Sequence, residues 1–228
     1  MTIQTDFDRI AALPHGVWYH NNHYHKFLLR YVPRNCEAAL DVGCGQGEFA
    51  RLLAERSRAV LAIDLSPEMI RVGQSGSSLN PNLESRVADL MSCEIPIASF
   101  DCVASIATLH HLPLREAVLK MKASLKSGGV MLMLDIFEPE RSLLKLEGLV
   151  AGLLHVPAMA ASASLRLLHN RRLHASREAR AAWREHSRHD AYPKLSEVRD
   201  LCAQVLRGAL ITRHLLWRYS VIWRKPAC

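Results

Sequence analysis

Two adjacent histidines, His110 and His111, are the residues of this sequence best suited to move a proton. They follow the apolar run Phe100–Ile106, which has the pattern of a buried strand. An imidazole titrates near neutral pH, so either ring could accept a proton from a phenol, a hydroxyl or an amine. The structural alternative is that one ring hydrogen-bonds the backbone while the other orients a substrate.

Three glycines at alternate positions, Gly43, Gly45 and Gly47, follow an apolar run that ends at Asp41 and Val42. Glycine adopts positive φ at low cost and has no Cβ, so such a turn lets the backbone approach a ligand closely. A glycine turn between a strand and a helix is typical of nucleotide sites at the carboxyl edge of a parallel sheet. Asp41 could also serve as an acceptor for N–H groups of the turn.

Two acidic residues end the next two strand-like runs. Asp64 lies 21 residues after Gly43, where a carboxylate can accept hydrogen bonds from both hydroxyls of a ribose. Asp89 ends the following run and could accept a hydrogen bond from an adenine amine, with Leu90 adding an N–H group and an apolar contact. The position of Asp64 alone would also suit an NAD-dependent dehydrogenase, but the spacing of the glycines and Asp89 disfavour that enzyme.

The elements that must position these residues alternate between strand and helix patterns. We predict strands at Ala38–Val42, Ala59–Ile63, Glu84–Ala88, Phe100–Ile106 and Val130–Asp135, and helices near Glu48–Arg56, Pro67–Ser75 and Leu114–Leu125. This alternation predicts an α/β protein with a parallel sheet and right-handed crossovers. A helix near Ser196–Leu206 leads to Ala209–Leu216 and Trp217–Arg224, two strands with almost nothing between them. They predict an antiparallel hairpin at the sheet edge.

Residues 138–190 interrupt this pattern and are predicted to form two or three helices. The first half is rich in leucine on more than one face, as in a buried helix or a homodimer interface. Glu147, His155 and Pro157 break the apolar stretch, so no transmembrane segment is expected. The second half is rich in arginine, which indicates a solvated face or, alternatively, a contact with a carboxylate or phosphate of a substrate. We expect a helical lid over residues 1–37, a core over 38–137 and 191–228, and a helical cap over 138–190.

Taken in order, these motifs resemble those of class I S-adenosylmethionine-dependent methyltransferases, especially the small-molecule branch with a segment like Leu109-His110-His111-Leu112 after strand four. The resemblance covers residues 38–135 well and the closing hairpin more loosely. It implies a Rossmann-like fold with a seven-stranded, mostly parallel sheet, a last strand that is antiparallel, helices on both faces and a helical cap inserted after strand five. The implied cofactor is S-adenosyl-L-methionine.

The resemblance also assigns roles to individual residues. It places Asp41, Gly43 and Gly45 around the methionine part of the cofactor, in a turn where a small residue such as Cys44 is usual. It implies that Asp64 holds the ribose. The residues expected to contact the adenine or the sulfonium side are Leu65, Met69, Asp89, Leu90 and Ile106.

Further candidates lie close to the methyl group in this scheme. His110 and His111 are the candidate catalytic bases. In similar enzymes the segment before strand one folds over the cofactor, so Tyr19, His20, Tyr24 and His25 are candidates for cofactor or acceptor contact. A second group is expected near the pocket, where the cap returns to the core: Trp183, His186, His189, Asp190 and Tyr192. His20, His23 and His25 do not share one face of a helix or strand, so no metal site is expected.

Composition narrows the partners. The net charge of +7 permits an acidic partner, but nucleic acid is not expected, because no nucleic-acid module is appended and no Asn/Asp-Pro-Pro-Tyr/Phe motif follows strand four. The six cysteines are scattered without a C-x-x-C pair, which argues against a disulfide framework or a zinc site. The first residues lack an apolar core with a basic lead, so a cytoplasmic location is expected.

The expected activity is methyl transfer by in-line displacement to a small, fairly apolar acceptor. Oxygen is the preferred target atom, with nitrogen and carbon as alternatives. Two other functions remain open from the sequence: an RNA or protein methyltransferase, and a non-catalytic cofactor-binding interaction protein on the same fold.

Overall fold

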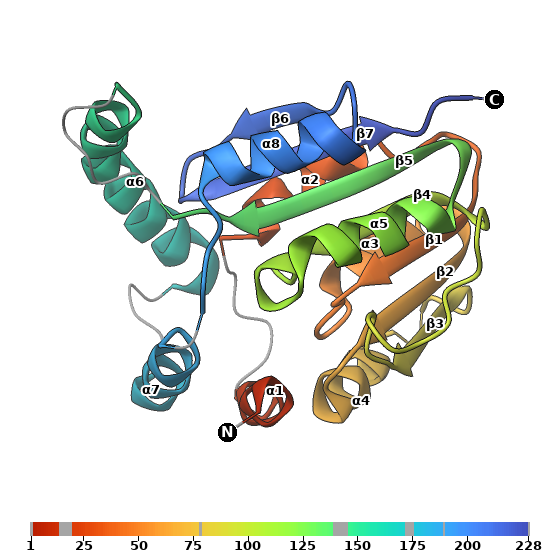
Figure 1. Cartoon of the computed structure of the whole chain (residues 1–228). Coiled ribbons are helices and arrows are strands. Elements are labelled where there is room, and N and C mark those ends of the chain that lie inside the picture. Colours follow the sequence, from red (N-terminus) through yellow and green to blue (C-terminus); the bar gives the residue numbers. More distant parts are fainter. Residues whose placement is uncertain are drawn as a thin grey trace.

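A computed structural model of the chain describes residues 2–13, 20–77, 79–138, 146–171, 176–188 and 190–227. Its centre is a seven-stranded sheet with the strand order β3-β2-β1-β4-β5-β7-β6 (Figure 1). The strands are β1 (Cys36–Val42), β2 (Ser57–Asp64), β3 (Leu83–Val87), β4 (Phe100–Ile106), β5 (Leu125–Ile136), β6 (Leu210–Arg213) and β7 (Arg218–Arg224). The first five are parallel, whereas β7 is antiparallel to both β5 and β6. The predicted Rossmann-like fold class is therefore confirmed.

The helices are α1 (Ile3–Ala11), α2 (Asn22–Leu29), α3 (Glu48–Ala54), α4 (Pro67–Ser75), α5 (Leu114–Ser124), α6 (Leu146–Asn170), α7 (Arg177–His186) and α8 (Leu195–Val205), with a single 3-10 turn, η1 (Leu109–His111). Alternate residues of the buried strands serve two different cores, as the pleat requires. Side chains such as Val103 and Met131 pack with α5 and α8, whereas Cys102 and Leu132 pack with α2 and α3. Figure 1 shows these two pairs of helices on opposite faces of the sheet.

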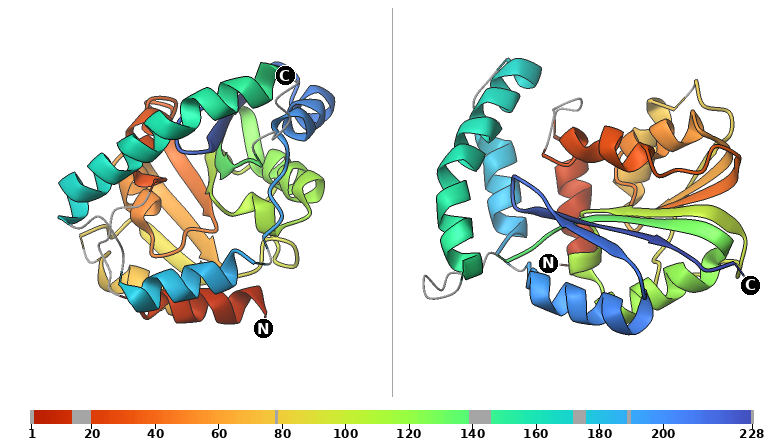
Figure 2. Two further views of the ribbon diagram at one scale, coloured as in Figure 1. Left: turned by 90° about the vertical axis from the view of Figure 1, so that its left-hand side faces the viewer. Right: turned by 90° about the horizontal axis from the view of Figure 1, so that it is seen from above.

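The carboxyl edge of the sheet is framed by the helices that do not cover its faces. Figure 2, left, looks onto this edge: α6 crosses one side, while α1 and α7 lie next to each other on the other side. Ile10 and Ala11 of α1 pack with Met69 of α4 and Ala182 of α7. Three helices from distant parts of the sequence therefore lie around the sheet edge that carries the loops of the candidate site (Figure 2).

The apolar residues of α6 whose burial is described are partly exposed, whereas the side chains of Leu146, Leu149, Val150 and Leu154 lie outside the described part of this helix. Leu153, Leu167 and Leu168 are exposed to 77%, 52% and 75%, while Leu165 packs against the core on the α2 side of the sheet. No helix in the described ranges is both long enough and apolar enough to cross a membrane. Leu143 and Leu144, at the start of the leucine-rich stretch, lie outside the described residues.

Two predicted element boundaries are wrong for backbone reasons. Strand β5 begins at Leu125 rather than Val130, because Gly128 takes a φ of +78° and lets the chain continue in the sheet through an irregular register with β4. Strand β6 ends at Arg213 rather than Leu216, because Leu216 and Trp217 both have positive φ and form the turn into β7. The hairpin itself is confirmed, with four residues between its strands.

Candidate active site

The glycine turn connects β1 to α3 and has the strained backbone that its sequence predicts. Gly43, Gly45 and Gly47 have φ values of +68°, +53° and +73°. The N–H groups of Gly43 and Cys44 donate to the Ile63 carbonyl, at 2.8 and 3.0 Å, which fixes the turn against β2. The glycines differ in their surroundings: one packs tightly against a neighbouring side chain, and another borders open space.

At Gly43 a Cβ atom would overlap the Thr108 side chain, whose hydroxyl donates to the Gly43 carbonyl over 3.2 Å. At Gly45, by contrast, a Cβ atom would have no heavy atom within 4 Å. Gly43 is therefore required for packing against the loop after β4. The backbone at Gly45 borders open space, where a ligand can reach it.

Asp64, at the end of β2, is tied to the same turn. Its Oδ2 accepts a hydrogen bond from the Gly45 N–H (2.8 Å) and its Oδ1 accepts one from the Ser66 N–H (2.9 Å). Burial raises the pKa of Asp64, while these two hydrogen bonds act in the opposite direction. The carboxylate thus joins the glycine turn to the start of α4.

Asp41 is the buried carboxyl group that lacks a complete set of partners. Its side chain is 1% exposed, and its Oδ2 atom has no hydrogen-bond partner among the described residues. Burial, with Asp64 nearby, raises the pKa of Asp41 to about 7. A buried polar atom without a partner is costly, so this oxygen fits a site completed by a donor group of a bound molecule. Burial also keeps the neighbouring Cys44 thiol protonated, with its pKa well above the usual value.

The residues expected near the adenine lie at the ends of β2, β3 and β4. Ser66 caps α4 by accepting the Met69 N–H (3.0 Å), and the Met69 side chain is buried beside α1. Asp89 accepts the Met91 N–H (2.8 Å) and the Ser92 hydroxyl (3.3 Å).

The apolar members of the same group differ in burial. Leu90 packs into the core, whereas Ile106 is half-buried at the end of β4 and Leu65 is half-buried after β2. The structure therefore brings the predicted cofactor residues of the core to one sheet edge, at four neighbouring strands.

His110 is held by a carboxylate that the sequence analysis did not select. Its Nδ1 lies 2.6 Å from Asp135 Oδ1, and its backbone N–H donates to Asp135 Oδ2 over 3.0 Å. The two side chains are only 3% and 1% exposed. Because Nδ1 faces Asp135, Nε2 is the ring nitrogen left for a substrate. Asp135 ends β5 at the same edge as His110, and an acidic residue that closes a buried apolar run was the available signal.

His111 belongs to a second, looser group. Its Nδ1 lies 3.4 Å from Asp190 Oδ1, which in turn lies 3.7 Å from His186 Nε2. Burial lowers the pKa of His111 to about 4, and His110 acts in the same direction, while Asp190 opposes them. Tyr192 donates its hydroxyl to Asp190 Oδ2 over 2.8 Å. The imidazole of His111 is therefore neutral at pH 7.

Aromatic rings surround the two imidazoles. The rings of His110 and His111 are 3.8 Å apart, Tyr192 lies 5.0 Å from His110, and Phe7 lies 5.4 Å from His111 (centroid distances). Phe7 comes from α1 and Tyr192 from the segment before α8. Aromatic rings from α1 and from the segment before α8 thus line part of the surroundings of the two histidines.

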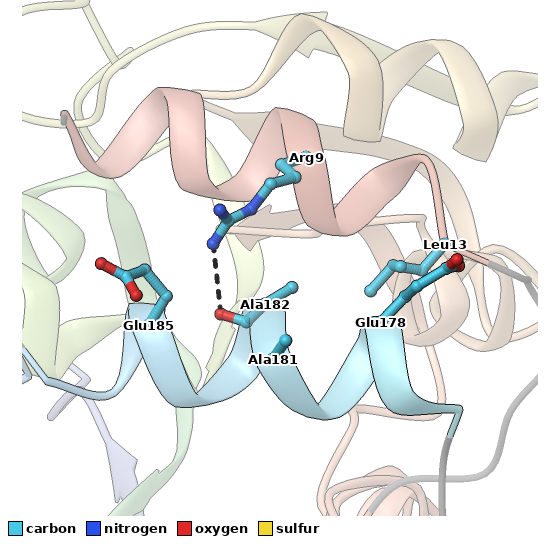
Figure 3. Close-up of a pocket in the computed structure, with 6 residues that line it drawn as sticks. All are labelled: Arg9, Leu13, Glu178, Ala181, Ala182 and Glu185. Carbon is cyan, nitrogen blue, oxygen red and sulfur yellow. Dashed lines mark hydrogen bonds between the residues drawn. The ribbon is translucent and has the colours of Figure 1, made fainter.

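Helix α1 packs against the start of α4 and against α7. Asp8 accepts hydrogen bonds from the Ser66 hydroxyl (2.5 Å) and the Glu68 N–H (3.4 Å), both at the start of α4. Arg9 donates to the Ala182 carbonyl of α7 over 3.5 Å (Figure 3). The pocket drawn there, about 250 Å³, lies between α1 and α7 and is lined by none of the predicted site residues.

The candidates from the N-terminal segment that the structure describes have partners outside the glycine turn. Tyr19 lies outside the described residues, as does His189 of the cap. His20 does not join the glycine turn: its Nε2 lies 2.7 Å from Ser162 Oγ of α6, and its ring lies 6.5 Å from Trp217. His25 stacks on Phe49 of α3 with a centroid distance of 5.2 Å. These histidines have different partners and do not converge.

Comparisons with known proteins agree with this geometry. The methyltransferase domain family matches residues 40–133. An uncharacterized methyltransferase of Mycobacterium tuberculosis is 32% identical over 213 residues, covering 92% of this chain and 98% of the relative. The ubiquinone biosynthesis O-methyltransferase of Xanthomonas euvesicatoria is 34% identical over 142 residues, 55% of this chain and 58% of that protein.

Solved structures share the fold. The N-methyltransferase NodS of Bradyrhizobium japonicum, in complex with S-adenosylhomocysteine, superposes with a TM-score of 0.67 at 14% identity, over 99% of this chain and 100% of that one. Magnesium protoporphyrin IX methyltransferase of Synechocystis, with bound S-adenosylmethionine, gives 0.54 at 13% identity, over 90% and 77%. The chain belongs to the class I S-adenosylmethionine-dependent methyltransferases. It is a methyltransferase, and its cofactor is S-adenosyl-L-methionine.

Proposed function

We propose that this enzyme transfers the methyl group to a hydroxyl oxygen of a small, fairly apolar acceptor, and that His110 takes the hydroxyl proton. The observation that carries the proposal is the buried pair of His110 and Asp135, with Nε2 of His110 left unbonded by the described residues. The similarity to ubiquinone biosynthesis O-methyltransferases supports oxygen as the target atom.

The chain's residues would hold the cofactor along the edge from β3 to β4. Bound S-adenosylmethionine supplies a methyl group on a positively charged sulfur. We assign Asp41, Gly43 and Gly45 to its methionine part and Asp64 to its ribose. The remaining assigned contacts are Leu65 and Met69 on the adenine face, Asp89 and Leu90 at the adenine edge, and Ile106 below the sulfonium side. The orphaned Oδ2 of Asp41 and the open space at Gly45 support this placement.

His110 and Asp135 divide the handling of the proton. A hydroxyl oxygen becomes a strong nucleophile only as its proton leaves, and a positioned base typically contributes about 10²–10⁴-fold to the rate. His110 would accept that proton on Nε2. Asp135 fixes the ring through Nδ1 and the loop through the His110 backbone N–H, and it stabilises the imidazolium that results. His111 is assigned a positioning role, because it packs against His110 and its own Nδ1 faces Asp190.

Holding the acceptor in place contributes the other part of the rate. Intramolecular orientation can supply up to about 7–11 kcal/mol of a barrier. Phe7, Tyr192 and the ring faces of the two histidines offer apolar surface for an acceptor body. Helix α1, which brings Phe7, would exclude water from the same space.

A second role for this cluster follows from one observation. Ligand atoms of His110, His111 and Asp190 all lie within 4.8 Å of one another. Two imidazoles and one carboxylate with open positions are a known set for divalent transition metals, and Asp135 would orient His110 as a carboxylate behind a metal ligand does. In this second candidate mechanism, a bound cation would lower the pKa of the acceptor hydroxyl in place of the base.

One set of measurements tests the proposal and separates the two roles. Calorimetry with S-adenosylhomocysteine should show binding, and a panel of phenols, aliphatic alcohols and amines should show transfer to oxygen. Turnover should survive dialysis against a chelator, and metal analysis should find no stoichiometric ion, if His110 is the base. Loss of turnover on chelation, restored by a divalent metal, would assign the cluster to a cation. Transfer to nitrogen, carbon or RNA alone would overturn the proposal.

A further inference from the structure

Arg218, the first residue of β7, is a partly buried arginine without an ion-pair partner among the described residues. Its Nε donates to Asn21 Oδ1 (2.7 Å) and its Nη1 donates to the Leu216 carbonyl (3.1 Å). A guanidinium has five N–H donors, so three of them have no acceptor in the described part of the chain. These donors belong to a partly buried guanidinium, and a fixed positive charge with unused donors can bind an anionic group.

Arg218 lies next to Asp135 in the sheet, because Arg218 of β7 pairs with Ile136 of β5 and the following residue, Tyr219, pairs with Asp135. Asp135 acts electrostatically on Arg218, as do the hydroxyls of Tyr24 and Tyr192. Asp135 already accepts hydrogen bonds from His110 and from the Ile136 N–H (2.7 Å). Arg218 is therefore on the strand that neighbours Asp135, at the carboxyl edge where His110 lies.

A second cation lies nearby on α6. Arg218 and Arg166 both act on His20, whose pKa burial and these two charges lower to about 4. His20 is thus neutral at pH 7 and adds no charge of its own. Both arginines are therefore close enough to His20 to act on it, one from β7 and one from α6, and neither has a carboxylate within ion-pair distance in the described ranges.

The turn before Arg218 is strained in a way that fixes this arginine. Leu216 and Trp217 have φ values of +62° and +57°, a region that bulky side chains rarely occupy. The Leu216 carbonyl in this turn is the one that accepts the Arg218 hydrogen bond. Strain of this kind is typically retained where it holds a functional group in place.

We propose that Arg218, assisted by the positive charge of Arg166, binds an oxyanion of the acceptor, either a carboxylate or a phosphate group. The acceptor would then have an apolar body, a hydroxyl group that reaches His110 and an anionic group that reaches Arg218. Arginine suits this contact because its planar fork matches the two oxygens of a carboxylate or phosphate. The inference rests on the proposed function, because it places the acceptor between His110 and Arg218.

The test compares matched acceptors in the full-length enzyme. The probes are 3,4-dihydroxybenzoate and 3-(3,4-dihydroxyphenyl)propanoate, each paired with its carboxamide, and the corresponding hydroxyphenyl phosphates. In the wild type we expect kcat/KM for the better anion to exceed that of its neutral partner by about tenfold or more, the scale of a charge-assisted hydrogen bond. In Arg218→Gln the preference should fall to within about threefold, mainly through KM, and Arg218→Lys should keep part of it.

Two controls keep the outcomes distinct. Arg213→Gln removes one positive charge from the neighbouring strand, where Arg213 lies over the Phe137 ring, and should leave the preference unchanged. If Arg218→Gln does not fold, Arg166→Gln and the lysine variant carry the test. An unchanged preference in folded Arg218 variants, or no preference in the wild type, would overturn this inference alone. Failure of every hydroxyl acceptor with S-adenosylhomocysteine binding intact would instead overturn the proposed function.

Discussion

His110 and Asp135 are joined by two hydrogen bonds, one to the imidazole Nδ1 at 2.6 Å and one to the backbone N–H at 3.0 Å. The two residues are 25 positions apart in sequence. His110 follows β4 and Asp135 lies near the end of β5, the strand paired with β4. Since both carboxylate oxygens are used, neither the ring nor the loop can turn without losing a contact in a buried site.

Asp135→Asn should slow turnover while leaving cofactor binding close to normal. The amide keeps the size of the side chain but cannot stabilise an imidazolium, so we expect kcat to fall by about 10²-fold or more. The kcat of His110→Gln should fall by a similar factor. The kcat of the double variant should be no lower than that of the slower single variant, because the two residues act as a unit. Single-turnover kinetics and calorimetry with S-adenosylhomocysteine measure the two quantities.

Asp101→Asn is the matched control for that experiment. Asp101 lies at the amino end of β4, where it pairs with Lys126 at 2.9 Å and accepts the Glu37 and Ala38 N–H groups. It should affect stability only. Equal losses of kcat in the Asp135 and Asp101 variants would show that Asp135 acts on the fold rather than on His110.

Asp64→Ala should weaken cofactor binding. The buried carboxylate would no longer hold Gly45 and Ser66 or accept from the ribose hydroxyls, and a hydrogen bond to a charged group is worth about 1.5–3 kcal/mol, or about 10–150-fold in affinity. Glu37→Gln, an exposed acidic residue at the other end of the sheet, serves as the control. Calorimetric affinities for S-adenosylhomocysteine that agree within threefold would contradict the assignment of Asp64.

Gly43→Ala and Gly45→Ala should fail in different ways. At Gly43 the added methyl group overlaps Thr108, so the variant should lose stability by more than the about 1 kcal/mol that a glycine-to-alanine change commonly involves. At Gly45 the methyl group has space, so only the positive φ of +53° opposes alanine. The loss of stability should therefore be smaller than at Gly43, and the methyl group would also occupy the open space where we place the cofactor, so cofactor affinity should fall. Urea unfolding and calorimetry separate the two outcomes, and Thr108→Gly should restore part of the stability of the Gly43 variant alone.

Acid should destabilise the fold partly through His25. Burial lowers the pKa of His25 from 6.5 to about 4, so the unfolded chain binds a proton that the folded chain does not between these values. The stability contributed by this residue is complete above pH 6.5 and is lost as the pH falls toward 4, by up to about 3 kcal/mol. Urea unfolding of wild type and His25→Gln at pH 7 and pH 5 checks this, since the variant should lose less stability over that interval.

The sequence predicted the parts of the site that depend on local pattern. Apolar runs predict the strand ends, glycine spacing predicts the turn after β1, and Ser66 followed by Pro67 indicates the start of α4. The site residues on these three features could therefore be predicted as one group. Asp190 was expected near the pocket, but its pairing with His111 was not predicted, and Asp135 was not selected at all. Both carboxylates reach the histidines from other strands and loops. Periodicity cannot report such contacts. Arg218 was missed for the same reason: within its strand it is one more alternating residue.

The two corrected boundaries share a cause. From residue type alone, the sequence predicts that one strand begins at Val130, after the glycines at 128 and 129, and that another ends at Leu216. Positive φ at Gly128, Leu216 and Trp217 decides where β5 and β6 begin and end. Two of these residues are bulky, and nothing local in the sequence favours that backbone conformation.

The unpartnered oxygen of Asp41 has a thermodynamic consequence for ligand uptake. At neutral pH the free enzyme is divided between protonated and ionised Asp41, because the pKa of this carboxyl is near 7. A cationic ligand at that position would favour the ionised form, so loading the enzyme should expel a fraction of a proton to the solvent. The heat of loading at pH 7 should then change with the ionisation enthalpy of the buffer, and Asp41→Asn should abolish that change.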